Sequence, residues 1–513
     1  MLKSVVLVLC VVFGSCSRIL VVFPVPSKSH SIISDSIVKI LLDGGHNVTY
    51  VSPSTKLKSR ERLNYIKISS EDLRDRNHQS LLDVVKNPQN PREILEKGVE
   101  YSKQVLQNEE VQELLSDFEE SYDAVLAEWY YSGLLAPLAA LYGCPLIWYT
   151  CEDISWVPLQ IVHEQTNPAY AVDSLASNIA VGNNIWSRAY RLWRQICLTA
   201  RIYYTINYVE SPAYHQIYQP IFQKRAVFLP DYESVLYNGS LMLINSHPAV
   251  GQNSPLPNNA KYVGGHHIEE PVKLLPQKLQ EILDNSTKGI IIFSLGTDIN
   301  TMALPLKMKW KLMDVFGELD QTVIWKVDEY MEDLPQNVLA VKWMPQKNIL
   351  NHTNTLLVIN QGGFISNIEA AYFGVPVISV PFYGDQLVSA DLMVAAGRGM
   401  RVDFCEEFPL KIKEAINVIL GNNSYRRSAH YTSTAFKRFM VPPAKELRHW
   451  VDLVISTQGA YHLRSPALQL TMFERLHLDI VALLIMFLWF LSKVLKVVQV
   501  HMADDDEEEK KNK

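Results

Sequence analysis

In the C-terminal half of this 513-residue sequence, two glycines and several polar residues follow an apolar run. In the stretch TLLVINQGGFISNIEAA, Gly362 and Gly363 stand where a strand is expected to give way to a helix. Glycines at such a turn let the backbone approach a ligand, and the first N–H groups of the helix attract an anion. Gln361 adds an amide and Ser366 a hydroxyl beside the turn. The pattern predicts a site for a diphosphate.

The residues that follow predict the rest of the ligand. Glu369 lies on nearly the same helical face as Ser366, and its carboxylate would repel phosphate, so we expect it to accept hydrogen bonds from ribose hydroxyls. Asp385 and Gln386 end the run VPFYGDQ. An acid beside an amide suits two neighbouring hydroxyls of a hexose. The order of these groups predicts a nucleotide-sugar site.

Two further segments give weaker signals. The run IIFSLGT ends in Ser294, Gly296 and Thr297, whose hydroxyls and open backbone suit phosphate oxygens. Trp343 ends the run VLAVKW and offers a flat surface for a nucleobase, with Gln346 about one turn further on. Small residues end many strands and tryptophans commonly pack in cores, so neither segment defines a site by itself.

The N-terminal half contains a possible acid–base pair. His30 follows the apolar run ILVVF, and Glu128 ends the apolar part of YDAVLAEWYY. A lone histidine in a loop and a surface carboxylate are the plainer interpretations, yet the two residues occupy matching edges of one sheet. An acid there can hold the far nitrogen of an imidazole and stabilise the imidazolium that forms on proton uptake. His30 is therefore predicted to be a general base and Glu128 its orienting partner.

These residues require two α/β domains to position them. An apolar strand over residues 19–23, a helical spacing from Ile33 to Leu41 and the strand NVTYVS form a βαβ unit, which favours a parallel sheet. The same alternation returns in GIIIFSLGT, TVIWKV, VLAVKW, TLLVIN and VPVISVP. Parallel sheets bind ligands beyond the carboxyl ends of their strands. The cleft between two such domains is the predicted active site.

Both ends of the chain are apolar. MLKSVVLVLCVVFGSCS, residues 1–17, has a lysine, an apolar run and then small residues, as is typical of a cleaved secretory signal peptide. The run from residue 480 to 491 becomes long enough to span a membrane when Lys493 and Lys496 reach the headgroups. The lysines on that side predict that the acidic tail lies in the cytosol.

The last residues resemble an address signal. Lys510 and Lys511 stand at the positions of a receptor-read retrieval signal of the endoplasmic reticulum, although a solvated charge run is the plainer interpretation. Together the two ends predict a single-pass type I protein of the endoplasmic reticulum membrane with most of its mass in the lumen.

Composition limits the partners. The formal net charge of −6, without a basic stripe, argues against nucleic acid. Six cysteines show no metal-ligand spacing, and a disulfide among them is compatible with the lumen but is not assigned. Asn47 begins an expected buried strand, so its sequon is not expected to carry a glycan. The remaining glycosylation candidates are Asn238, Asn285, Asn351 and Asn422.

The run WMPQKNILNHTNTLLVINQGGFISNIEAAYFGVPVISVPFYGDQ, residues 343–386, resembles the signature of the UDP-glycosyltransferases, the family that includes the UDP-glucuronosyltransferases. GHNVTYVSP, NSHPAV and IIFSLGT also resemble members, and FPVPSKSHS resembles the arthropod branch. The resemblance implies a GT-B fold, in which two Rossmann-like domains face a cleft and a C-terminal transmembrane helix tethers them to the membrane.

The resemblance also implies boundaries. They are a signal peptide over 1–17, an N-terminal acceptor-binding domain over 18–250, a linker over 251–272, a C-terminal UDP-sugar-binding domain over 273–440, a return helical segment over 441–476, a transmembrane helix over 477–500 and a cytosolic tail over 501–513.

The implied activity is an inverting transfer of a hexose from a UDP-sugar to the hydroxyl of a small lipophilic acceptor, for detoxification or hormone modification. His30 would take the hydroxyl proton as the oxygen attacks the anomeric carbon, which gives a β-glycoside. No metal or cofactor is expected, because helix dipole and loop donors carry the leaving-group charge and the UDP-sugar is a co-substrate. UDP-glucose is favoured, since glucuronate needs a cation and none is near Asp385 in sequence.

Three positions differ from the usual family pattern. Gln361 replaces a histidine, Ile365 an asparagine and Glu128 an aspartate. These changes leave open a membrane-anchored UDP-sugar or lipophile binder of weak catalytic power, but retention of His30 and Glu128 favours the enzyme. Glucuronate as donor sugar and a homo-oligomeric state also stay open.

A cluster of aromatic residues is expected to wall the acceptor pocket, although core or membrane-facing positions are equally compatible with it. The cluster consists of Trp156, Trp186, Trp193, Tyr203, Tyr204 and Tyr208.

Overall fold

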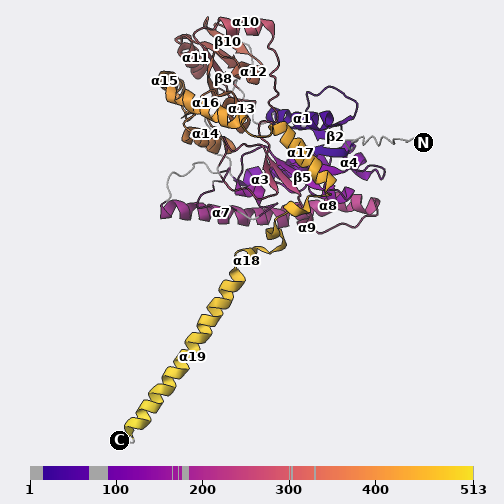
Figure 1. Cartoon of the computed structure of the whole chain (residues 1–513), viewed down its shortest axis with the longest axis vertical. Coiled ribbons are helices and arrows are strands. Elements are labelled where there is room, and N and C mark those ends of the chain that lie inside the picture. Colours follow the sequence, from indigo (N-terminus) through magenta and orange to yellow (C-terminus); the bar gives the residue numbers. More distant parts are fainter. Residues whose placement is uncertain are drawn as a thin grey trace, which may run out of the picture. The chain divides into compact units, whose positions relative to one another are not determined.

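The computed structural model describes residues 16–511 apart from 69–90, 164–165, 172, 176–183, 253, 298, 300, 302–303 and 329–330. The chain divides into two compact units, Met1–Arg464 and Ser465–Lys513. The first unit contains both β-sheets, and the second is helical (Figure 1). The predicted signal peptide lies outside the described residues over positions 1–15.

The N-terminal sheet has the strand order β3-β2-β1-β4-β5-β6-β7 among the described residues, and every pair is parallel. Its strands are β1 (Arg18–Val22), β2 (Asn47–Ser52), β3 (Leu63–Lys67), β4 (Ala124–Glu128), β5 (Leu146–Thr150), β6 (Leu241–Ile244) and β7 (Ala260–Tyr262). The chain first winds outward from β1 in one direction and then from β4 in the other. The topological switch point of this sheet therefore lies between β1 and β4.

The C-terminal sheet repeats this arrangement with the order β10-β9-β8-β11-β12-β13, again all parallel. Its strands are β8 (Ile290–Ser294), β9 (Thr322–Lys326), β10 (Val338–Val341), β11 (Thr355–Asn360), β12 (Val377–Ser379) and β13 (Gly399–Arg401). The switch point lies between β8 and β11. Two parallel α/β sheets were predicted, and this prediction is confirmed.

Helices cover both faces of each sheet. In the N-terminal half they are α1 (Lys28–Asp43), α3 (Pro91–Leu106), α4 (Glu109–Ser116), α5 (Pro137–Tyr142), α6 (Trp156–Leu159), α7 (Ile185–Thr205), the π-helix η2 (Ile206–Glu210), α8 (Ser211–Lys224) and α9 (Tyr232–Leu236). In the C-terminal half they are α10 (Gln277–Asn285), α11 (Leu306–Gly317), α12 (Gln346–Leu350), α13 (Phe364–Phe373), α14 (Asp385–Ala395), α15 (Phe408–Gly421), α16 (Asn423–Lys437), α17 (Pro443–Ser456) and the 3₁₀ turn η4 (Tyr461–Leu463).

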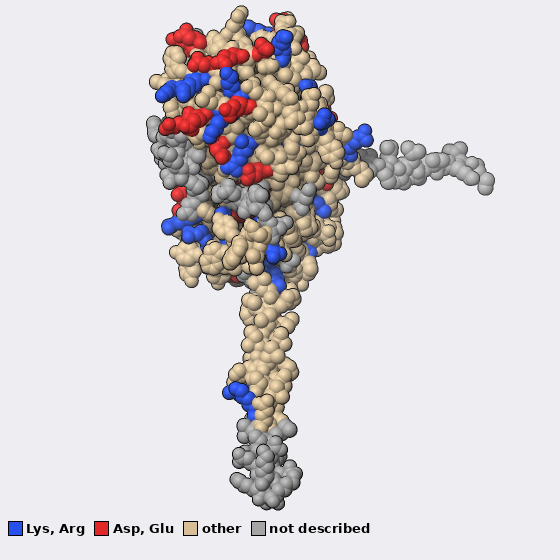
Figure 2. Space-filling model, turned by 90° about the vertical axis from the view of Figure 1, so that its left-hand side faces the viewer, with Lys and Arg blue, Asp and Glu red and all other residues tan. Residues whose placement is uncertain are grey.

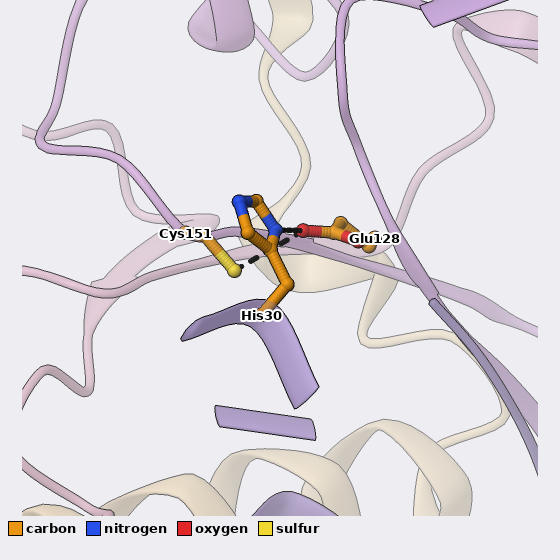
Figure 3. Close-up of side chains that lie close together, drawn as sticks. All are labelled: His30, Glu128 and Cys151. Carbon is orange, nitrogen blue, oxygen red and sulfur yellow. Dashed lines mark hydrogen bonds and ion pairs between the residues drawn. The ribbon is translucent and has the colours of Figure 1, made fainter. Parts of the chain in front are cut away.

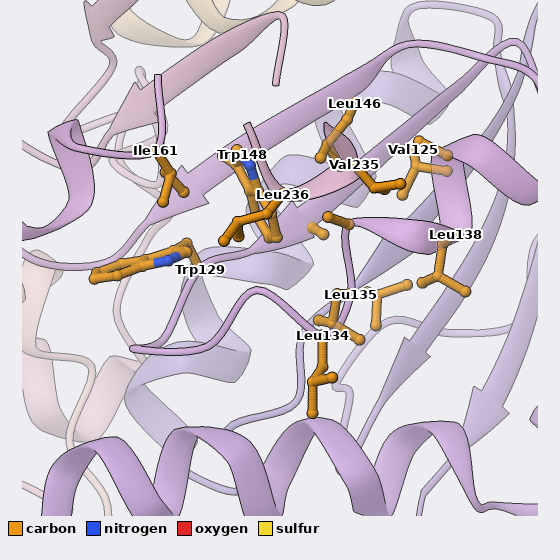
Figure 4. Packing of buried hydrophobic residues seen from close by; sticks show 14 of the residues in the cluster. Val125, Trp129, Leu134, Leu135, Leu138, Leu146, Trp148, Ile161, Val235 and Leu236 are labelled. Carbon is orange, nitrogen blue, oxygen red and sulfur yellow. The ribbon is translucent and has the colours of Figure 1, made fainter. Parts of the chain in front are cut away.

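Burial on both faces explains why the strands are continuous apolar runs. In β1, Leu20 and Val22 belong to one buried cluster, while Ile19 and Val21 belong to a different one, because successive side chains point to opposite faces. Figure 4 shows the first cluster, where Trp148 of β5 lies among leucine and valine side chains. Polar groups are thereby confined to the strand ends.

The helix α17 returns to the N-terminal half after the second sheet is complete. Its Leu447, Val451 and Val454 are fully buried in the cluster that contains Ile19 and Val21 of β1. Because the C-terminal half supplies part of the N-terminal core, the two halves are tied together. The segment predicted as a linker, 251–272, contributes β7 to the N-terminal sheet.

The second unit contains η5 (Pro466–Gln469), α18 (Met472–Arg475) and α19 (Leu478–Lys511). By length and composition, Leu478–Gln499 is long and apolar enough to cross a membrane, with a mean hydropathy of 2.2. The sequence places the predicted span, 477–500, over this segment.

The sequon asparagines differ in exposure. Asn47 is half-buried at the start of β2, and the four glycosylation candidates are exposed. Their use by the cell stays a prediction. The cysteines of the described chain, Cys16, Cys144, Cys151, Cys197 and Cys405, are not joined in disulfides.

We expect Leu447→Ala to lower the stability of the protein by about 2–5 kcal/mol, because it removes a fully buried side chain of α17. The matched control is Leu410→Ala on α15, where the side chain is exposed and the effect should stay within about 0.5 kcal/mol. Denaturation of the purified full-length variants measures both. Equal stabilities of the two would show that α17 is not part of the N-terminal core.

Candidate active site

A cavity of about 630 Å³ lies between the two sheets, at the carboxyl ends of their strands. Most of the predicted site residues line it: His30, Ser294, Gly296, Thr297, Trp343, Gln346, Gln361, Gly363, Ser366, Glu369, Asp385 and Gln386. Glu128 and Gly362 are not among the lining residues and lie behind them. The two switch points thus face one cavity from opposite sides.

His30 and Glu128 contact each other at the switch point of the N-terminal sheet. His30 lies in the first turn of α1, which follows β1, and Glu128 ends the neighbouring strand β4. The Nδ1 atom of His30 contacts Glu128 Oε1 directly, and the other ring nitrogen points away from the carboxylate (Figure 3). Glu128 is buried, whereas the His30 side chain is 18% exposed. A carboxylate in this position fixes the ring and favours its protonated form.

Cys151, directly after β5, completes this cluster. Its thiol donates to the same Glu128 Oε1 over 3.1 Å (Figure 3). Ligand atoms of His30, Glu128 and Cys151 lie within 4.8 Å of one another, a spacing that a metal ion would accept. However, burial raises the pKa of the Cys151 thiol well above its usual value, and the charge of Glu128 adds to the effect. Metals bind the thiolate, so the chemistry of this set fits a hydrogen-bonded imidazole rather than a metal centre.

A buried polar network shapes the glycine turn after β11. Asn360 Oδ1 accepts from the Gly362 N–H over 2.8 Å, and Asn360 Nδ2 donates to Asn367 Oδ1 over 2.8 Å. Asn367 in turn donates to Ser389 Oγ over 2.8 Å. Gly362 adopts φ = 81°, and an added Cβ would lie 2.8 Å from the carbonyl oxygen of Gln386. Only glycine fits this turn, and the network holds it in place.

The turn places the N-terminus of α13 at the cavity. Gly363 is the N-cap and provides no side-chain hydrogen bond to the first N–H groups of the helix. The Oε1 atom of Gln361 is buried without a hydrogen-bond partner among the described residues. Backbone N–H groups and the helix dipole therefore meet at one point, an arrangement that suits phosphate oxygens. The Nε2 atom of Gln361 could add a donor there, whereas its unpartnered Oε1 can only accept from a donor of the ligand.

Glu369 is oriented by a neighbouring amide. Gln346, the first residue of α12, donates from Nε2 to Glu369 Oε2 over 2.7 Å and to Ser366 Oγ over 3.2 Å. His267 Nε2 lies 3.3 Å from the other carboxylate oxygen, Glu369 Oε1. The carboxylate is buried at the wall of the cavity, where hydroxyl groups of a ligand could donate to it.

Trp343 does not pack in the core. Its side chain is 44% exposed, and Lys56 of the N-terminal half lies over the ring, with Nζ 3.8 Å from the ring centroid. Lys28 approaches the same ring at 5.8 Å. A flat, accessible ring suits stacking of a nucleobase, and two cations at this end of the cavity favour a ligand rich in negative charge.

Asp385 and Gln386 differ in their contacts. Gln386 is buried, and its Oε1 accepts the N–H groups of Phe382 and Tyr383 over 3.0 and 3.3 Å. Its amide oxygen therefore stabilises the turn before α14. Both residues line the cavity, where Gln386 Nε2 could donate to a ligand and the Asp385 carboxylate could accept from one.

A family model described as UDP-glucoronosyl and UDP-glucosyl transferase matches residues 18–504. The chain belongs to this family. UDP-glucosyltransferase 2 of Dactylopius coccus is 26% identical over 508 residues, covering 97% of this chain and 96% of the relative. The ecdysteroid UDP-glucosyltransferase of Spodoptera littoralis nuclear polyhedrosis virus is 25% identical over 512 residues, covering 94% and 96%. The resemblance seen in the sequence is confirmed, and the chain is a glycosyltransferase.

A solved structure shares the fold of this chain. The glycotransferase of kitacinnamycin superposes with a TM-score of 0.56 at 16% identity, covering 86% of this chain and 99% of the other. At this identity the likeness shows the fold alone. With two parallel sheets facing a cavity, it confirms the GT-B fold predicted from the sequence.

Sequence reasoning missed Glu152 in this transferase. Glu152 follows β5, lines the cavity and accepts the hydroxyl of Tyr131 over 2.7 Å at Oε2. Burial and, after it, the negative charge of Asp385 raise the pKa of Glu152 from 4.5 to about 8. The strand-end rule that selected Glu128 would also have selected Glu152, since TCE ends the run LIWYTCE.

The acceptor wall of the transferase also differs from its prediction. Trp156 is buried in the core, and the other five aromatic residues of the predicted cluster are exposed. None of the six lines the cavity, so that prediction is wrong. The apolar wall near His30 instead consists of Ile94, Tyr101, Tyr130, Tyr131 and Leu175. The Tyr130 ring packs edge-on against His30 with a centroid distance of 5.9 Å.

The unusual Ile365 has a packing role in this family member. It lines the cavity from α13 and packs against the buried cluster of the N-terminal half. An apolar contact between the halves therefore stands where the family resemblance implies an asparagine in many members.

The stability of Glu152→Gln should depend on pH in a defined direction. The folded protein holds a proton on Glu152 up to about pH 8, whereas the unfolded chain releases it near 4.5. The wild-type protein therefore loses stability as pH rises through this window, and the neutral glutamine does not. We expect the thermal midpoint of the variant to exceed that of the wild type by a margin that grows from pH 5 to pH 8. The exposed Glu281→Gln is the control, and a margin that is flat with pH would contradict the raised pKa.

Proposed function

We propose that this protein transfers glucose from UDP-glucose to the hydroxyl group of a small lipophilic acceptor, with inversion at the anomeric carbon. The observation that carries the proposal is the His30–Glu128 contact in the same cavity as the glycine turn and Asp385. A base and its orienting acid thus face the residues suited to a UDP-sugar.

His30 acts as the general base. It takes the proton of the acceptor hydroxyl as that oxygen forms a bond to the anomeric carbon, and buried Glu128 stabilises the resulting imidazolium. The bond between the anomeric carbon and the UDP oxygen breaks on the opposite face of the sugar. An α-linked donor consequently gives a β-glycoside and UDP.

The leaving diphosphate is stabilised by the C-terminal half. The open N-terminus of α13, with the amide of Gln361, donates to the oxygens on which negative charge develops. Glu369, held by Gln346, receives the ribose hydroxyls, and Trp343 stacks with uracil. These roles use groups that the chain itself supplies, so the proposed mechanism requires no metal or cofactor.

Charge at the sugar end favours glucose over glucuronate. Asp385 and Glu152 both line the cavity and interact electrostatically with each other. The four lysines that line it lie elsewhere: Lys28 and Lys56 at Trp343, Lys326 at Asp328 and Lys347 at the carbonyl of His267. A glucuronate carboxylate beside Asp385 would meet like charge, which costs free energy in a buried site. Two whole-length relatives are also named as glucosyltransferases.

The acceptor and the compartment follow from the surroundings. The tyrosine-rich wall beside His30 suits an apolar, ring-containing acceptor, and the viral relative is named for ecdysteroids. The apolar N-terminal stretch, exposed sequons and candidate span support a luminal catalytic unit on the endoplasmic reticulum membrane, with detoxification or hormone modification as its role.

A second candidate is a UDP-sugar or lipophile binder with weak catalytic power. Gln361 and Ile365 motivate it, since both depart from the family pattern. The formed His30–Glu128 contact favours turnover, because a binding protein has no use for an oriented base.

His30→Ala should lower the turnover rate about 10²–10⁴-fold, the range expected for loss of a general base. The affinity for UDP should stay nearly unchanged, because His30 belongs to the acceptor half. Initial rates with a phenol acceptor and calorimetric titration with UDP measure the two quantities. His215→Ala, an exposed histidine on α8, is the matched control. Turnover of the His30 variant at the control level would remove His30 from the mechanism.

The donor preference is tested by supplying membranes that carry the protein with UDP-glucose or UDP-glucuronate and a panel of phenols and steroids. We expect β-glucosides as the main product, identified because β-glucosidase hydrolyses them to the free acceptor and glucose. Glucuronides as the main product would show that the donor sugar is glucuronate and not glucose. Saturable binding of UDP-glucose without product on any acceptor would favour the binding protein.

A further inference from the structure

The helix α7 has an aromatic face that is exposed among the described residues of the first unit. Trp186 is 80% exposed and Trp193 63%, values far from those of aromatic side chains in a core. With 21 residues, the helix is about 30 Å long. The exposed large side chains used in the argument are Trp186, Tyr190, Trp193, Ile196, Tyr203 and Tyr204.

These side chains share one side of the helix. At 100° per residue, the exposed apolar residues fall within about half of the helical circumference. The opposite side buries a narrow stripe composed of Gln195, Leu198, Ile202 and Thr205. A helix of a soluble domain normally turns its apolar side inward, and α7 has the reverse distribution.

Basic residues lie at the edges of the aromatic face. Arg188 and Arg201 are exposed, and α7 contains no acidic residue. Figure 1 shows α7 along the lower edge of the first unit in that view, and Figure 2 shows most of the acidic side chains of the visible face higher up. Aromatic residues flanked by arginine are typical of helices that lie in a membrane interface.

We propose that α7 lies flat in the interface of a lipid bilayer, with its aromatic face among the acyl chains and Arg188 and Arg201 at anionic headgroups. The same chain carries the candidate span, which begins at Leu478, so a bilayer is available to α7. Trp and Tyr suit the boundary between headgroup and hydrocarbon, since one end of each is apolar and the other hydrogen-bonds.

Charge favours a bilayer over a second copy of the protein. In a contact between two α7 helices, no acidic side chain of the partner helix would face the arginines. Phosphate groups of anionic lipids would pair with them. The inference does not depend on the donor or acceptor assigned above.

The buried side of α7 connects this surface to the active site. Arg191 donates to the Ala169 carbonyl over 2.8 Å, and Arg194 pairs with Asp173 at 3.0 Å. Arg194 also donates to the carbonyl oxygen of Leu175, and Leu175 lines the acceptor side of the cavity. The helix in the interface therefore supports the acceptor wall, and acceptors dissolved in the membrane are concentrated next to it.

The exposed Cys197 on α7 permits a direct test. The full-length protein is reconstituted in nanodiscs of phosphatidylcholine and phosphatidylserine, and Cys197 is labelled with an environment-sensitive fluorophore. Emission is recorded with and without lipids that carry a quencher on the acyl chain. We expect a blue-shifted emission and at least about threefold stronger quenching than at a solvent-exposed position.

Two variants provide the controls. Cys197→Ser reports labelling at other cysteines, and Cys197→Ser combined with Tyr431→Cys places the label on the exposed side of α16, where Tyr431 is 77% exposed. Equal emission and quenching at positions 197 and 431 would overturn the proposal. Protection of Cys197 from the quencher, together with Cys197-to-Cys197 cross-linking between copies, would overturn it in favour of a second copy.

The tryptophans provide an independent check. Trp186→Glu with Trp193→Glu should reduce quenching at Cys197 towards the level at position 431, while the thermal midpoint stays near that of the wild type, because neither side chain is buried. Unchanged quenching in this variant would mean that the aromatic face does not hold α7 in the bilayer.

Discussion

The carboxylate of Glu128 is buried at the end of β4, with the imidazole of His30 and the thiol of Cys151 on one of its oxygens. A negative charge without water is costly unless partners compensate for the lost solvation. A protonated imidazole compensates better than a neutral one, so the buried carboxylate favours proton uptake by His30. The adjacency of β1, β4 and β5 brings these three side chains together, and the proposed pair of base and orienting acid depends on that adjacency.

The other half depends on a rigid turn. Asn360, Asn367 and Ser389 form a buried hydrogen-bonded chain beneath Gly362, which is satisfied within the protein. A satisfied buried network specifies one backbone conformation. The N-terminus of α13 therefore has a fixed position before any ligand binds, as the proposed stabilisation of a leaving diphosphate requires.

The two halves are joined by apolar contacts. The α17 helix completes the N-terminal core, and Ile365, which lines the cavity, packs against the same cluster. The lining of the cavity is polar and charged where the donor is expected, and it is apolar where the acceptor is expected. Leu175, at the apolar end, is linked through Arg194 to a helix whose outer face suits lipid.

The sequence by itself determined the local features of this protein. Continuous apolar runs set the strands, as TLLVIN and NVTYVS show by matching β11 and β2 residue for residue. Most of the candidate site residues could be found as the polar residues that follow strands, because parallel strands present their carboxyl ends at one edge of the sheet. The glycine turn was predictable for the same reason, since it depends on neighbouring residues in the chain.

Only the tertiary structure decided contacts between distant segments. It placed His30 against Glu128, 98 positions apart in the sequence, and Lys56 on the ring of Trp343, and it made Glu152 a neighbour of Asp385. It also turned the aromatic side of α7 outward. Helical spacing shows which residues share a side, but burial depends on what packs against that side, and distant parts of the chain supply or withhold that packing.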